Sequence, residues 1–373
     1  MPRGSWRRGG NEGMSSIAGA SVAGATAGEE IERGDSALTL QGRDRAIDGW
    51  RAIAALFVVI AHAATFRYGA AEGALAHLAQ RLATPLAQTG VQIFFVISGY
   101  IITALMMRER QASGRVDLAA FYTRRSCRIV PPLLVYYASL VMLDASGALS
   151  LPLTSLVSSV SFSCNTGIVD CHWWVAHTWS LAVEEQFYLA WPMLFVLVAP
   201  LLRARLLALG VIACGVAVAA RPGVFHSNAT SFGCIAAGAL YASSAGLRRT
   251  IQRARATVPW LGAVALLIIA PLTRLDTAVA LFLPPLVTYL VFCGNALPWV
   301  RAILVAPPFQ LVGAASYSLY LWQQLFLAQP RHYAADAPSL LLLPLAVLAS
   351  VWLVERPSIA LGRRLSRRGA VEV

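Results

Sequence analysis

The stretch "RAIAALFVVIAH", residues 51–62, places an arginine and a histidine at the two ends of a hydrophobic run. In an α-helix, eleven residue steps make three full turns and about 20°, so Arg51 and His62 lie on one face. At 1.5 Å per residue, the two side chains are about 16 Å apart along the helix axis. A long molecule lying along this helix could therefore contact both residues.

The rest of the chain is unusually apolar. Hydrophobic residues make up 57% of the 373 residues and charged residues only 13%, and the mean hydropathy is +0.62. This composition is typical of a multi-pass membrane protein and argues against a soluble globular domain. A chain of this length accommodates about ten spans of about 20 residues with short connections.

Ten hydrophobic segments predict an all-α fold with ten transmembrane helices. The first 45 residues are rich in Gly, Ala, Ser and Arg without periodicity, so residues 1–45 are expected to form a disordered cytoplasmic segment. The ten-helix membrane domain then occupies residues 46–357, followed by a basic cytoplasmic tail over 358–373. The predicted spans are 48–66, 86–107, 130–146, 178–200, 204–221, 229–245, 258–274, 277–295, 311–329 and 338–355.

The basic residues predict the orientation of these spans. All thirty are arginines, and the net charge is +12. They form short clusters between apolar segments rather than one basic face, which argues against nucleic-acid binding. With a cytoplasmic N-terminus, 25 arginines fall on the inner side and five on the outer side. This asymmetry follows the positive-inside rule and places both termini in the cytoplasm.

Ionisable residues inside the predicted spans are candidate functional groups, because a charge in the bilayer is costly. In "HTWSLAVEEQFYLAW", residues 177–191, Glu184 lies about 10 Å below the outer end of its span, at a depth comparable to that of His62. The adjacent Glu185 points about 100° away, so we expect Glu184 to face His62. His177 shares the face of Glu184. Alternatively, these groups are structural, a hydrogen-bonded core histidine and carboxylates that anchor neighbouring helices.

Two further motifs supply candidate substrate-binding residues. In "FFVISGYIIT", residues 94–103, the pair Ser98-Gly99 interrupts an apolar helix. Small residues at such a place usually indicate close helix packing, and we add Ser98 as a binding candidate. The second motif, "FYTRRSCRIVPP" at 121–132, lies on the predicted inner side, where arginines bind lipid phosphates and suit a nucleotide phosphate equally well. Its arginines are Arg124, Arg125 and Arg128.

Only one pair of cysteines is placed to form a disulfide. Cys164 and Cys171 lie in the long outer connection, about 147–177, where a disulfide and two unpaired thiols are both compatible with the sequence. The other four cysteines are interpreted as small apolar residues in or beside spans. We predict no metal site, because the histidines, thiols and carboxylates lack a ligand spacing.

Taken together, these motifs resemble the integral membrane acyltransferase 3 family over nearly the whole chain. The resemblance implies that Arg51 and His62 are the signature pair of the family and that Glu184 is the acidic residue of its fourth helix. Gln323 differs, because many members have histidine at that position, and Tyr100 replaces the usual phenylalanine. The matching motifs are "DGWRAIAALFVVIAH", "FFVISGYIIT", "FYTRRSCRIVPP", "HTWSLAVEEQFYLAWP", "SYSLYLW" and "VERP".

The resemblance also implies an activity. Members of this family move an acyl group, commonly acetyl from coenzyme A, onto a hydroxyl of a sugar or another envelope molecule. It therefore implies acyl-coenzyme A as co-substrate without a bound cofactor, a saccharide or other hydroxyl acceptor, and a place in the bacterial cytoplasmic membrane.

The expected mechanism uses the residues singled out above. The phosphates of acyl-coenzyme A would lie near Arg51 and the three arginines of 121–132, and the pantetheine arm would extend to His62. His62 then acts as general base, oriented by Glu184, or carries the acyl group itself. A transporter or flippase is the competing interpretation, in which Arg51, His62 and Glu184 form a proton or substrate site.

Overall fold

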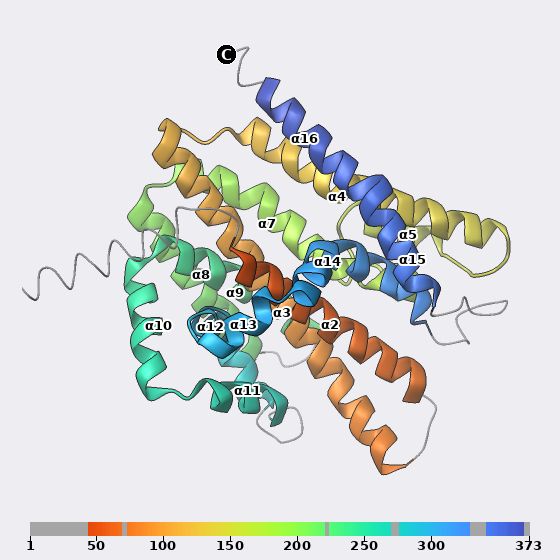
Figure 1. Ribbon diagram of the computed structural model, residues 1–373, viewed down its shortest axis with the longest axis horizontal. Helices are drawn as coiled ribbons and strands as arrows, with labels where there is room; N and C mark the ends of the chain where they lie inside the picture. Colours follow the sequence, from red (N-terminus) through yellow and green to blue (C-terminus); the bar gives the residue numbers. More distant parts are fainter. Residues whose placement is uncertain (1–43, 69–72, 221–223, 270–275, 329–340, 369–373) are drawn as a thin grey trace, which may run out of the picture. The chain divides into compact units, whose positions relative to one another are not determined.

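The computed structural model describes residues 44–68, 73–220, 224–269, 276–328 and 341–368 (Figure 1). Nearly all of the segment expected to be disordered, residues 1–45, lies outside these described residues. The described residues contain helices, turns and no β-strand, which confirms the all-α class. The helices are α2 (Arg45–Tyr68), α3 (Ala74–Ser113), α4 (Leu118–Ala145), α5 (Leu153–Val160), α6 (Trp173–Ala176), α7 (Thr178–Leu197), α8 (Pro200–Ala220), α9 (Val224–Ser243), α10 (Ala245–Thr257), α11 (Trp260–Ile269), α12 (Asp276–Asn295), α13 (Pro298–Val305), α14 (Pro307–Phe326), α15 (Leu342–Ala349), the π-helical η3 (Ser350–Glu355) and α16 (Arg356–Arg368).

Each of the ten predicted hydrophobic segments contains a helix, but fewer helices could cross a membrane by length and hydropathy. Within the described residues, a sixth span is possible if Leu281–Asn295 and Pro298–Val305, bent by 86°, form one broken span. Ten spans with both termini in the cytoplasm therefore stay a prediction. The five continuous candidates are Arg45–Phe66, Ala74–Ser113, Leu118–Ala145, Pro200–Ala217 and Leu342–Ser366.

Glycines allow the central helices to approach closely. A Cβ atom on Gly99 of α3 would lie 1.9 Å from the main-chain oxygen of Ile235 in α9. A Cβ atom on Gly238 of α9 would lie 2.0 Å from the main-chain oxygen of Val96 in α3. Only glycine fits at such a crossing, as in other closely packed helix pairs. The packing interpretation of Ser98-Gly99 is thus confirmed for Gly99.

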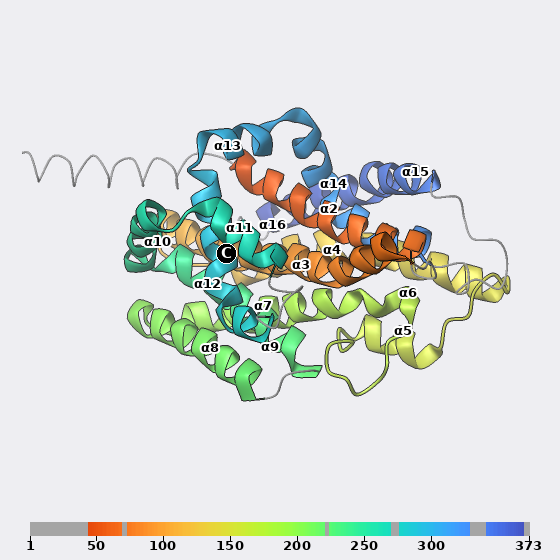
Figure 2. The same cartoon turned by 90° about the horizontal axis from the view of Figure 1, so that it is seen from below.

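The helices around the site are arranged in layers. Figure 2 shows α3 and α4 between α2 with α14 on one side and α7 with α8 on the other. Helix α14 packs on α2, and α16 runs beside α4 (Figure 1). The helix α16 thus continues past the boundary that we predicted at residue 357, so part of the expected tail packs on the helical domain.

Large apolar side chains are exposed on several of these helices. Examples are Met142 on α4, Leu209 on α8 and Leu353 on η3. Exposed apolar surface of this extent is unusual for a soluble monomer and matches a surface that faces lipid. The fold is therefore that of a multi-pass membrane protein.

The long connection between α4 and α7 is ordered by polar contacts. Cys164 and Cys171 form a disulfide, which answers the question that the sequence left open. Asn165 and Gln186 exchange two side-chain hydrogen bonds of 3.0 Å. The connection is thereby attached to α7, the helix that carries Glu184.

Candidate active site

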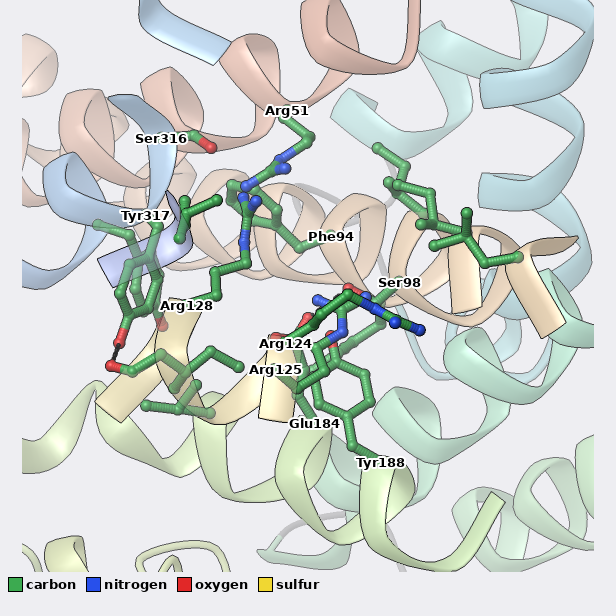
Figure 3. Close-up of a pocket in the computed structure, with 18 of the residues that line it drawn as sticks. Arg51, Phe94, Ser98, Arg124, Arg125, Arg128, Glu184, Tyr188, Ser316 and Tyr317 are labelled. Carbon is green, nitrogen blue, oxygen red and sulfur yellow. Dashed lines mark hydrogen bonds between the residues drawn. The ribbon is translucent and has the colours of Figure 1, made fainter. Parts of the chain in front are cut away.

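A cavity of about 670 Å³ lies between α2, α3, α4, α7, α14 and α16. Apolar side chains from α3 and α4 form much of its wall, and Figure 3 shows the polar side chains that project into it. Cavities of this size suit organic molecules of the dimensions of a cofactor. Its charged and histidine residues are Arg51, Arg108, Glu109, Arg124, Arg125, Arg128, His177, Glu184 and Arg363.

Arginines dominate the charge of this cavity. Six line it, against two glutamates, and we call the six the arginine cluster: Arg51, Arg108, Arg124, Arg125, Arg128 and Arg363. Figure 3 shows Arg51 from α2 and Arg128 from α4 pointing toward one another. Two guanidinium groups that face each other repel, so this geometry favours an anion between them. Glu355 attracts both groups electrostatically from outside the cavity lining.

The arginines of α4 differ in their surroundings. The Arg124 guanidinium forms an ion pair of 3.7 Å with Glu109, and both side chains are partly exposed. The Arg125 guanidinium lies 4.7 Å above the ring of Tyr188, in a cation–π contact. Within the described residues, the side chains of Arg51 and Arg128 make no hydrogen bond or ion pair. Both side chains are therefore available to an anionic ligand.

Ser98 and Glu184 are directly linked. The Ser98 hydroxyl donates a hydrogen bond of 2.6 Å to a carboxylate oxygen of Glu184, which joins α3 to α7. Glu184 lines the cavity, whereas the neighbouring Glu185 is absent from its lining. Ser98 therefore lines the cavity while Gly99 packs on the neighbouring helix, and a role of Ser98 in substrate binding stays a prediction.

Two buried polar groups in the cavity wall have no hydrogen-bond partner among the described residues. His177 is 5% exposed, and among the described residues neither of its ring nitrogens makes a hydrogen bond. The hydroxyl of Ser316 on α14 is buried and unpaired in the same sense. Buried polar groups are nearly always hydrogen-bonded in folded proteins. Their position in the cavity wall therefore marks places where a ligand could supply the missing partner.

His62 lies beside the cavity rather than in its lining. Its Nδ1 atom is 2.7 Å from the side-chain oxygen of Gln323 on α14, and its ring meets the ring of Trp173 edge to face at 5.8 Å. His177 interacts electrostatically with His62 and also lines the cavity. His177 is thus the cavity residue next to His62.

The hydrogen bonds differ from our expectation that Glu184 orients His62. Within the described part of the chain, no hydrogen bond or ion pair joins the two, because Glu184 bonds Ser98 and His62 bonds Gln323. The amide at position 323 reaches His62 since α14 packs along α2. His62 and Glu184 are therefore not hydrogen-bonded, although the sequence places them at a comparable depth in the membrane.

Of the eight residues singled out in the sequence, the cavity lining includes seven, Arg51, Ser98, Arg124, Arg125, Arg128, His177 and Glu184. Four lining residues were not predicted from the sequence as part of the site: Arg108, Arg363, Ser316 and Tyr320. Arg363 was assigned to the tail, although it follows Ile359 by four residues on one face of a helix, which is a detectable pattern. Ser316 and Tyr320 have the same spacing within "SYSLYLW".

The chain is similar to known acyltransferases. Residues 44–354 match the profile of acyltransferase family 3, described as an acyltransferase domain. The Staphylococcus aureus (strain COL) protein named "Putative O-acetyltransferase SACOL0978" is 30% identical over 166 residues, which are 40% of this chain and 24% of that protein. O-acetyltransferase OatA of S. aureus (strain NCTC 8325 / PS 47) is 31% identical over 120 residues, 28% of this chain and 19% of OatA.

These alignments cover less than a quarter of the length of those curated relatives. No solved structure matches the chain. The family profile, in contrast, extends over most of the chain and includes every residue of the cavity except Ile359 and Arg363. The chain therefore belongs to the acyltransferase 3 family.

Proposed function

We propose that this chain is a membrane-bound O-acyltransferase. It moves an acyl group, with acetyl as the expected group, from acyl-coenzyme A to a hydroxyl of a saccharide or another envelope molecule. The observation that carries the proposal is an arginine-lined cavity whose wall ends at a histidine beside His62. The names of the O-acetyltransferase relatives support the choice of acetyl.

The arginine cluster supports a donor that carries several phosphates. Guanidinium groups bind phosphate through paired hydrogen bonds, and Arg51 and Arg128 face one another without an ion-pair partner among the described residues. Phosphates between them would remove the repulsion. Coenzyme A carries phosphates at one end and the reactive thioester at the other, so this end of the cavity would bind its nucleotide portion.

The remaining cavity supports binding of the pantetheine arm. Its wall is mostly apolar, with the unpaired polar groups of His177 and Ser316. A pantetheine arm has the same mixed character, since methylene groups alternate with amides that can pair with an imidazole or a hydroxyl. The thioester would pass the His177 ring to reach His62.

The proposed chemistry at His62 is a general-base transfer. The imidazole removes the proton from the acceptor hydroxyl while its oxygen attacks the thioester carbonyl. The carbon–sulfur bond then breaks, and the imidazolium returns the proton to the departing thiolate. In the alternative route, the His62 imidazole attacks the thioester carbonyl, the carbon–sulfur bond breaks and coenzyme A leaves as the thiol with the imidazole proton. The acceptor hydroxyl then takes the acyl group from the imidazole, which recovers the hydroxyl proton. In this mechanism Glu184 helps to form the cavity wall, where it bonds Ser98, and does not orient His62.

The proposed setting is the bacterial cytoplasmic membrane, with ten spans and both termini in the cytoplasm. The arginine distribution supports this orientation. The arginine cluster would then face the compartment that contains coenzyme A thioesters. Single cysteines placed in the connections, labelled from either side with an impermeant maleimide, test the orientation.

The acyltransferase proposal is tested by a new ester on the acceptor. Cells that express the chain should contain saccharides with alkali-labile acetyl esters, detected by mass spectrometry, and cells expressing the His62→Ala variant should lack them. The matched control is Arg249→Ala, an exposed residue of α10. Export of a saccharide without a new ester, lost in the His62→Ala variant, is the result expected of a transporter and would overturn the proposal.

A further inference from the structure

We infer that Gln323, Gln324 and the main-chain carbonyl of Trp173 form a polar relay that fixes the tautomer of His62. The relay keeps the proton on Nδ1 and leaves Nε2 free to accept a proton. The role of this tautomer in catalysis rests on the proposed function, whereas the tautomer itself does not.

The two amides of the relay are buried. Gln323 is fully buried and Gln324 is 2% exposed. A buried amide that lacks partners for its oxygen or its NH₂ group is costly, so its orientation follows from its neighbours. The direction of each hydrogen bond in the relay can therefore be derived from the group at its end.

The carbonyl oxygen of Trp173 determines that direction, because a carbonyl can only accept. The Gln324 NH₂ group donates to it at 2.7 Å, which leaves the Gln324 side-chain oxygen facing Gln323. The Gln323 NH₂ group donates to that oxygen at 3.3 Å, and the Gln323 side-chain oxygen then faces His62. That oxygen must accept, so the Nδ1 atom of His62, 2.7 Å away, carries the proton.

Trp173 contacts both Gln324 and His62, the first and last residues of the relay. Its indole N–H donates a hydrogen bond of 3.3 Å to the main-chain oxygen of Gln324, so the two residues bond each other twice. Its ring also packs against the His62 ring. The imidazole is therefore positioned by one residue through both a ring contact and the relay.

The relay replaces the carboxylate that orients the histidine in a Ser-His-Asp arrangement. There, the acidic group selects the tautomer and stabilises the imidazolium. Here an uncharged amide selects the tautomer, and the carboxylate of Glu184 bonds Ser98 instead. Gln323 and Gln324 are thus positioning residues, which act on the acceptor hydroxyl only through His62.

The tautomer is measured directly by ¹⁵N NMR. Full-length protein labelled at histidine in lipid nanodiscs gives separate signals for protonated and unprotonated ring nitrogens, and the His62 signals are assigned by their absence in His62→Ala. We expect a protonated Nδ1 and an unprotonated Nε2 for neutral His62. A protonated Nε2 in the wild-type protein would overturn the relay, whether or not the protein transfers acyl groups.

Variants test the direction of the relay. In Gln324→Leu the Gln323 amide loses its fixed orientation, so the Nε2-protonated tautomer should appear in the spectrum. Gln92→Leu is the matched control, because Gln92 is a buried glutamine that bonds Ser231 and not the relay. A wild-type tautomer in a folded Gln324→Leu variant would contradict the inference, as would a changed tautomer in Gln92→Leu.

Measurements of kcat and KM distinguish a positioning role of Gln323 from a purely structural one. Gln323→Leu should lower kcat by about tenfold or more, up to the roughly 10²- to 10⁴-fold that general-base catalysis contributes. The KM for the donor should stay unchanged. Gln323→His should restore kcat, since an imidazole can accept from His62 and donate to Gln324. Equal activity of the Leu and His variants, or a loss in KM alone, would overturn the positioning role. If the wild-type protein shows the expected His62 tautomer but transfers no acyl group, the proposed function is rejected and the relay is retained.

Discussion

Removal of Arg128 should weaken binding of the donor's phosphates and little else. Arg128 lines the cavity and has no hydrogen bond or ion pair among the described residues. A hydrogen bond to a charged group contributes about 1.5–3 kcal/mol. The Arg128→Ala variant should therefore raise the KM for acetyl-coenzyme A by about 10- to 150-fold.

Arg124 provides the comparison within the same helix. Its guanidinium is 41% exposed and already pairs with Glu109 at 3.7 Å. Exposed ion pairs contribute about 0–1 kcal/mol, so Arg124→Ala should raise KM by less than about fivefold. The exposed Arg249 lies outside the cavity lining, and Arg249→Ala should leave KM unchanged.

The assay compares acetyl-coenzyme A with S-acetylpantetheine, a donor that has the same thioester and lacks the phosphates. Initial rates of acetyl transfer by purified protein in proteoliposomes give KM for each donor. The effect of Arg128→Ala should disappear with S-acetylpantetheine. An equal rise in KM for both donors, or an effect of Arg128→Ala no larger than that of Arg124→Ala, would refute the reasoning.

Three further predictions concern stability and the cavity wall. Gly99→Ala should destabilise the protein by more than about 1–3 kcal/mol, because its Cβ would lie 1.9 Å from a main-chain oxygen. The control Gly210→Ala, whose Cβ would have no atom within 4 Å, should keep the wild-type melting temperature. Equal melting temperatures of the two variants would contradict the helix contact. Cys164→Ser should lower the free energy of unfolding by about 2 kcal/mol, because it opens the disulfide loop. The denaturant midpoint should fall, and a reducing agent should lower the midpoint of the wild type in the same way. An unchanged midpoint would argue against the disulfide. Ser98→Ala removes the hydrogen bond of 2.6 Å to Glu184 and should lower kcat/KM by about tenfold, and full activity would exclude a role for this pair.

Local spacing predicted much of this site. Helical periodicity separated Glu184 from Glu185 and placed His177 on the face of Glu184, and both Glu184 and His177 line the cavity. The expected pairing of Glu184 with His62 is not among the hydrogen bonds of the described residues. The close packing of Gly99 followed from residue size alone. These features depend on one helix or on neighbouring residues, where the geometry of an α-helix determines the outcome.

Long-range contacts were not predictable in the same way. Gln323 is 261 residues from His62 in the chain, and only the packing of α14 on α2 brings them together. Arg363 enters the site because α16 packs beside α4. The periodicity of one helix carries no information on which other helix it contacts, so the partner of His62 and the contribution of α16 required the structure.

The proposed acyl transfer at His62 can be followed with radiolabelled acetyl, carried from acetyl-coenzyme A into membrane glycans. Inverted membrane vesicles that contain the wild-type chain, the His62→Ala variant or the Arg249→Ala control are supplied with labelled donor, and alkali-labile label is counted in the glycan fraction. We expect label with the wild type and the Arg249→Ala control and none above background with His62→Ala. Equal label with His62→Ala and the wild type would contradict this expectation.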